Sequence, residues 1–132
     1  MGKQILAVVV GAVMGFVVLG LIEMVSWMLY PMPEGLDIAN AEVMRAYVSQ
    51  VPIGAKLIVL VAWMIGAFVA GFLAAKIAPE GKGRQSAIFA GAILMLGGIA
   101  NAFMVPHPMW MLIIGLLQYI PLAHIGAKAA GK

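Results

Sequence analysis

Long, nearly uncharged apolar stretches dominate the chain and predict its architecture. Four of them are long enough to cross a bilayer as helices, which takes about 20 residues at 1.5 Å per residue. These stretches cover about residues 5–30, 53–77, 86–105 and 109–125. We therefore predict an all-α membrane protein: a four-transmembrane-helix bundle that forms a single integral membrane domain over residues 1–132.

The fourth stretch contains a proline that interrupts its predicted helix. Pro121 has no backbone N–H, so the carbonyl of Leu117 loses its helical partner and a bend is expected there. In lipid, such a carbonyl needs another donor. A neighbouring helix or a polar side chain such as Gln118 can supply one.

Residues 31–52 form the only sizeable polar segment between spans, and they contain a predicted short helix. Apolar positions recur there with helical spacing, at Val43, Met44, Tyr47, Val48 and Val51. Asp37 or Asn40 can cap the start of this helix. We predict an amphipathic helix on the outer membrane surface that caps the bundle. A lid or a partner-docking surface is the alternative.

Composition narrows the class of protein. Of 132 residues, 64% are hydrophobic and 10% are charged, and the mean hydropathy is +1.09. Such a chain has too little polar surface for a water-soluble domain and too few clustered cations for a nucleic-acid partner. The absence of cysteine excludes disulfides, thiolate metal sites and a cysteine nucleophile.

The distribution of positive charge predicts the orientation. Lysine and arginine concentrate before the first span, in the second connection and after the fourth span: Lys3, Lys76, Lys82, Arg84, Lys128 and Lys132. The first connection, residues 31–52, contains both acidic and basic residues. The third connection, residues 106–108, has no lysine or arginine. The positive-inside rule therefore predicts a multi-pass protein with both termini cytoplasmic.

Small residues predict close helix packing. In lipid they let helix backbones approach one another. The candidate packing positions are Gly11, Gly15, Ala70, Gly91, Gly97 and Gly98. The sequence leaves open whether the packed partner is the same chain or another copy.

Glu23 is the outstanding polar residue, because a carboxyl group inside a membrane span is costly and faces a bundle interior or a cavity. It lies about seven residues, or roughly 10 Å, from the outer end of its span. The candidate intramembrane polar site comprises Glu23, Ser26, Lys56, Asn101 and Gln118. We favour a structural bridge, with Glu23 protonated or paired to Lys56, over a proton or cation site.

The outer turn between the third and fourth spans contains a second group of candidates: Pro106, His107, Pro108 and Trp110. A turn-stabilising role for His107 is favoured over titration near neutral pH. His124 lies about 17 residues farther along, toward the opposite membrane face, so the two histidines are not expected to share a metal.

No motif predicts catalysis. Ser26, Ser49 and Ser86 lack a nucleophile-elbow pattern, and the chain has no phosphate-binding glycine loop. We predict no catalytic residue, no enzyme activity, no metal and no cofactor.

Three short motifs carry a resemblance: Pro106-His-Pro-Met-Trp110, Gly97-Gly-Ile-Ala-Asn101 and Pro31-Met-Pro-Glu-Gly35. With them the chain resembles uncharacterised small four-span bacterial inner-membrane proteins, a group without an assigned activity. The resemblance implies the bacterial cytoplasmic membrane and no particular substrate.

Three functional hypotheses follow. We favour a non-catalytic accessory or self-assembling protein that packs through its Gly/Ala-rich helix faces. The alternative is a small-solute or ion transporter or channel, proton-coupled, that uses Glu23 and Asn101. A subunit of a membrane enzyme complex is the third. Expected partners are the lipid bilayer and a homo-oligomer or larger membrane complex, without nucleic acid. A cavity around Glu23 would favour transport.

Overall fold

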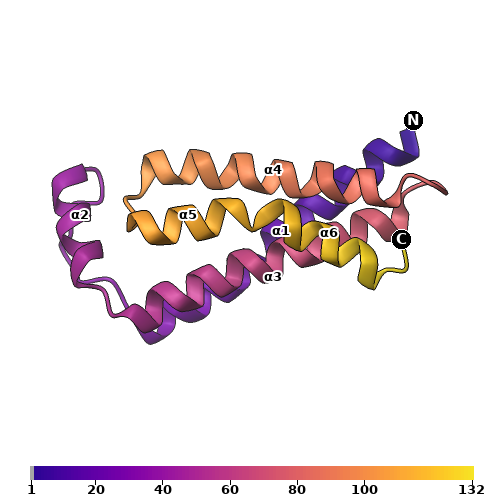
Figure 1. The fold of residues 1–132 in the computed structure, drawn as a ribbon. Coiled ribbons are helices and arrows are strands. Elements are labelled where there is room, and N and C mark those ends of the chain that lie inside the picture. The colour runs from indigo at the N-terminus through magenta and orange to yellow at the C-terminus, as the bar shows by residue number, and fades with distance from the viewer. Residues whose placement is uncertain (1) are drawn as a thin grey trace.

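The computed structural model describes residues 2–132 and shows the all-α bundle that the sequence predicts (Figure 1). Met1, the first residue of the predicted domain, lies outside the described residues. The four spans are α1 (Gly2–Leu29), α3 (Ile53–Ile77), α4 (Gly83–Met104) and the pair α5 (Met109–Leu117) and α6 (Tyr119–Ala129). The short helix α2 (Ala41–Gln50) lies between the first two spans.

Three spans are longer than their apolar stretches. The helices α1, α4 and α6 extend past the predicted limits, through polar residues such as Lys3, Arg84 and Lys128. Backbone hydrogen bonding continues a helix beyond the residues that face lipid, so an apolar run underestimates helix length.

The fourth span breaks at Gln118, one residue after α5 ends. The Gln118 Nε2 donates a hydrogen bond to the carbonyl of Gly115 over 2.9 Å. Of the two predicted donors for the Leu117 carbonyl, Gln118 is therefore wrong, because its side chain folds back over the preceding turn. The backbone ladder resumes at once, because Leu122 N–H donates to the Gln118 carbonyl.

The central helix of the bundle is α3, which packs against α1, α4 and α6. Its contact with α1 brings the two backbones together. A Cβ atom on Gly11 would lie 2.5 Å from the Ala70 carbonyl oxygen, and one on Gly15 would lie 2.8 Å from that of Gly66. These contacts therefore require glycine.

The contacts of α6 and α4 also depend on glycines that allow close approach. A Cβ atom on Gly71 or Gly126 would overlap the backbone of the facing helix, and one on Gly91 would lie 2.7 Å from the Ala123 Cβ. On the other flank of α4, a Cβ atom on Gly97 would meet Phe16 of α1.

All six predicted packing residues make close contacts within the chain: Gly11, Gly15, Ala70, Gly91, Gly97 and Gly98. Contact with another copy stays a prediction.

The two halves of the bundle diverge at one end. Figure 1 shows α1 and α3 separating from α4 and α5 toward the end where α2 lies, whereas both termini lie at the other end. We call these the α2 end and the terminal end. Because α3 contacts α6 extensively and α5 only slightly, the bundle is tight at the terminal end and open at the α2 end.

The capping helix α2 is initiated by Asn40, one of the two predicted caps. Its Oδ1 accepts hydrogen bonds from the N–H groups of Glu42 (3.0 Å) and Val43 (3.2 Å). Asp37 instead accepts from Ala39 in the preceding turn. Met44, in the predicted apolar stripe, is buried, and most of the stripe faces the opening between the helix pairs. Side chains of α2 line this opening, but the helix makes no helix–helix contact within residues 2–132. The capping role and the placement on a bilayer surface therefore stay predictions.

The α1–α3 contact generates a matched pair of variants. Gly11→Ala should lower stability by about 1–3 kcal/mol, because the added methyl group overpacks a backbone contact. Gly20→Ala on the same helix meets no atom within 4 Å and should be neutral or slightly stabilising, since alanine favours helix. Thermal unfolding in detergent measures both, and equal melting temperatures would contradict the packing described.

Candidate functional site

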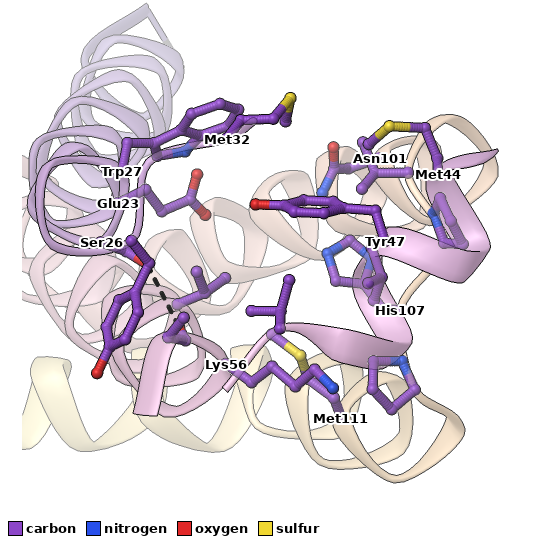
Figure 2. Close-up of a pocket in the computed structure, with 18 residues that line it drawn as sticks. Glu23, Ser26, Trp27, Met32, Met44, Tyr47, Lys56, Asn101, His107 and Met111 are labelled. Carbon is purple, nitrogen blue, oxygen red and sulfur yellow. Dashed lines mark hydrogen bonds between the residues drawn. The ribbon is translucent and has the colours of Figure 1, made fainter. Parts of the chain in front are cut away.

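A cavity of about 220 Å³ lies between the diverging helix pairs at the α2 end (Figure 2). Its walls come from α1, α2, α3, α4, the turn at residues 105–108 and the first turn of α5. Apart from tyrosine and tryptophan, five charged or polar side chains line it: Glu23, Ser26, Lys56, Asn101 and His107. Four of the five residues of the predicted polar site are thus brought together.

Gln118 is the exception. It is 8% exposed in the break between α5 and α6, and it does not line the cavity. Its Nε2 is taken by the Gly115 carbonyl, while its Oε1 is buried without a hydrogen-bond partner among residues 2–132. Placing Gln118 in the site was therefore wrong, because the helix break turns its side chain toward its own backbone.

Glu23 is held by a partner that the sequence analysis missed. The Trp63 Nε1–H donates a hydrogen bond of 2.7 Å to Glu23 Oε1, and Trp63 is only 4% exposed. Among residues 2–132 no ion pair joins Glu23 to Lys56, so the predicted pairing of these two is wrong. Figure 2 shows the Lys56 side chain running away from the carboxyl group.

The sequence did contain a signal for Trp63. It lies ten residues into α3, about 15 Å along the helix from Ile53 and away from the interface where tryptophan is common. A buried indole N–H requires an acceptor. The room for the ring comes from Gly115, because a Cβ atom there would overlap the indole.

The remaining polar residues occupy separate walls of the cavity. Ser26 Oγ donates a long hydrogen bond of 3.4 Å to the Ala55 carbonyl and so links α1 to α3. In Figure 2, Asn101 faces the cavity from α4, and the hydroxyl group of Tyr47, on α2, points toward Glu23. Among the described residues the Asn101 amide has no side-chain hydrogen bond, which leaves it available to a bound molecule.

The turn between α4 and α5 forms part of the cavity as well as connecting two helices. Pro106, His107 and Pro108 line it, whereas Trp110 does not and is 39% exposed. The His107 ring packs edge-on against Trp63, with ring centroids 5.4 Å apart. Trp63 therefore contacts both Glu23 and His107.

Burial lowers the pKa of His107 below its ordinary value, an effect that the nearby Val105 backbone opposes in part. Its Nδ1 is buried without a hydrogen-bond partner in the described chain. His124, on α6, does not line the cavity. No three histidine, aspartate or glutamate residues gather as a metal site within residues 2–132.

The cavity ends inside the bundle. Toward the terminal end the space between the helices is filled by buried apolar side chains, of which Leu94, Met111 and Tyr119 are the largest that are fully enclosed. The arrangement can therefore hold a small polar molecule reached from the α2 end. It holds one carboxyl and one ammonium group on different walls.

The Glu23–Trp63 contact predicts the effect of removing one donor. Trp63→Phe keeps most of the ring volume but leaves the carboxyl oxygen without its N–H, which should cost about 1.5–3 kcal/mol. Trp110→Phe, at an exposed position, should change stability by less than about 0.5 kcal/mol. Thermal unfolding in detergent measures both; similar losses would argue that the hydrogen bond does not stabilise the fold.

The lowered pKa of His107 predicts an acid-sensitive fold. Between the folded and unfolded pKa values the unfolded chain binds more protons, so stability should fall as the pH drops below about 6.5. His107→Gln should have a flatter stability profile between pH 7 and pH 5. Denaturation midpoints over this range provide the measurement, and parallel profiles would refute the assignment to His107.

No family model, no curated protein and no solved structure matches this chain, so the function of the site has to be argued from its own geometry.

Proposed function

We propose that the chain is a small-solute transporter of the bacterial cytoplasmic membrane that binds its solute in the cavity at the α2 end. Glu23 and Asn101 are the principal polar contacts. The observation that carries the proposal is the cavity itself, which Glu23 helps to line. A carboxyl group inside a membrane span marks a substrate or ion pathway when it faces such a space.

The packing of the small residues favours the transporter hypothesis over the accessory hypothesis. The accessory hypothesis relied on Gly/Ala-rich helix faces that would bind another copy or a larger complex. Those faces are occupied by α1, α3, α4 and α6 of the same chain. What the bundle presents around α1 is a surface of large apolar side chains suited to lipid. The accessory and enzyme-subunit hypotheses stay predictions.

The divergence of the two helix pairs is the basis of the transport mechanism that we propose. The pairs meet at the terminal end through α3 and α6 and separate at the α2 end. Rocking of one pair against the other would close the α2 end and open the terminal end, the alternating access used by transporters built from two helical halves. Exchange of a proton for solute at Glu23 couples the two states.

Charge gives the direction of access. Apart from those in the first connection, most lysine and arginine residues lie at the terminal end, including Lys3, Lys82 and Lys128. By the positive-inside rule this end is cytoplasmic. The cavity then opens to the outside.

The chain contains no cysteine, so single-cysteine variants test this proposal cleanly. Asn101→Cys should react with a membrane-impermeant methanethiosulfonate from the outer side of sealed vesicles, and more slowly from the inner side if the cavity alternates. Ala90→Cys, on the same helix but 0% exposed, should react from neither side.

Two exposed positions calibrate the sidedness of this experiment. Glu34→Cys should react only in right-side-out vesicles and Lys82→Cys only in inside-out vesicles. An Asn101→Cys variant as inert as Ala90→Cys would overturn the cavity as a solute site. Labelling of Asn101→Cys from the outside alone would contradict transport and leave a protein that only binds its solute.

A further inference from the structure

The Glu23 carboxyl group lines the cavity without a cationic partner. Within residues 2–132 its hydrogen-bond donor is the uncharged indole of Trp63, and no lysine or arginine forms an ion pair with it. A carboxylate within a membrane span is costly unless a positive charge neutralises it. In the proposed exchange, a proton neutralises Glu23 in one state. The solute that replaces this proton therefore has to bring a positive charge of its own.

Glu23 also has hydrogen-bonding capacity left. Trp63 occupies Oε1 and orients the group, whereas Oε2 accepts no hydrogen bond from the described residues. The hydroxyl group of Tyr47 points toward Glu23 from α2, and Asn101 faces the same cavity from α4 (Figure 2). Carboxylate, hydroxyl and amide oxygens all accept hydrogen bonds. A primary ammonium group, which has only N–H donors, therefore suits this set of acceptors better than a quaternary one, which has none.

Aromatic and thioether side chains line the cavity together with Glu23. Trp27 lies four residues after Glu23 on α1, a spacing that places both side chains on one face of the helix. Tyr30, Met32 and Tyr47 line the same space. Aromatic faces attract ammonium groups, and thioethers are apolar and polarizable. These surroundings suit both the positive charge and a hydrocarbon group attached to it.

The other charges of the cavity favour a ligand with a single positive charge. Within residues 2–132, Glu23 is the only acidic residue of the lining, so a second ammonium group would find no carboxylate. Lys56, which also lines the cavity, runs away from Glu23 and leaves its carboxyl group free (Figure 2). A ligand carboxylate on the carbon that carries the ammonium group would lie close to Glu23 and be repelled by it. A monoamine is therefore favoured over a diamine and over an α-amino acid.

The cavity defines the charge of the ligand more closely than its length. The space lies where α1 and α3 separate from α4 and α5, toward the α2 end (Figure 1). An alkyl or arylalkyl group can therefore extend from Glu23 along this opening.

From these observations we infer that the cavity binds an apolar monoamine. Its single primary ammonium group lies on Glu23, and its hydrocarbon group lies against the aromatic and methionine side chains. This inference rests on the proposed function, because it names the substrate class of the same cavity.

A matched set of ligands tests the charge requirement on the parent protein. Purified full-length protein in an uncharged detergent at pH 7 is equilibrated with radiolabelled 2-phenylethylamine, and unlabelled competitors are added. The alcohol 2-phenylethanol lacks the charge, 3-phenylpropanoate reverses it, and L-phenylalanine adds a carboxylate beside the ammonium group. Each should compete at least about tenfold more weakly than 2-phenylethylamine, because each loses or opposes the contact with the Glu23 carboxylate.

A trimethylated analogue tests the hydrogen bonds. Phenethyltrimethylammonium keeps the positive charge and the phenyl group but has no N–H donor. It should also compete at least about tenfold more weakly than the primary amine. Equal competition would overturn the primary amine and leave a site that holds organic cations by charge and aromatic faces.

Three variants assign the contact to Glu23. Glu23→Gln keeps an oxygen acceptor for the Trp63 N–H and should weaken 2-phenylethylamine at least about tenfold. Lys56→Gln should tighten binding about twofold or more, because a positive side chain no longer opposes the ligand. Glu34→Gln removes a carboxyl group from an exposed position outside the cavity and should bind as the parent does. Weaker binding by Lys56→Gln would contradict the inference, because Lys56 would then hold part of the ligand.

The outcomes separate this inference from the proposed function. The competitor series uses only the parent protein, so it decides the charge requirement even where Glu23→Gln does not fold. Competition by the alcohol, the anion or L-phenylalanine as strong as that by 2-phenylethylamine would overturn the monoamine. No binding of 2-phenylethylamine, with Asn101→Cys labelled from outside, would reject the substrate class and keep the solute cavity. No binding together with inert Asn101→Cys would reject both.

Discussion

The close approach of helix backbones along α3 is the constraint on which the structure depends. In lipid the hydrophobic effect does not drive helices together, so association relies on van der Waals contact between surfaces that fit. Gly11 and Gly15 of α1 meet α3 on one side, and Gly126 of α6 meets it on another. Replacing any of these hydrogens by a methyl group would place atoms inside van der Waals distance of the neighbouring helix.

That packing also creates the cavity. The glycine contacts that join the two halves lie in the middle and terminal part of the bundle, and toward the α2 end bulkier side chains line the space between the pairs. Two stiff helix pairs held tightly at one end diverge at the other. The break at Gln118 falls between the open half of the fourth span, α5, and the packed half, α6.

Trp63 connects the fold to the site. Its indole fills the room left by Gly115, its Nε1–H orients the Glu23 carboxyl group and its ring contacts His107. A polar group inside a membrane protein is expensive unless it has a partner. One buried aromatic side chain thus orients the carboxyl group on one wall and contacts the histidine turn on the other.

The sequence alone determined the number of spans, the short helix between the first two spans with Asn40 as one of its two possible N-caps, the packing positions and Glu23 as the central polar residue. These follow from local properties: apolar run length, periodicity and the cost of charge in lipid. Only the tertiary structure decided that Trp63 and not Lys56 binds Glu23, that Gln118 turns away, and that the glycine faces close within one chain. Each depends on how far helices separate and rotate, because a shift of one residue turns a side chain by about 100°.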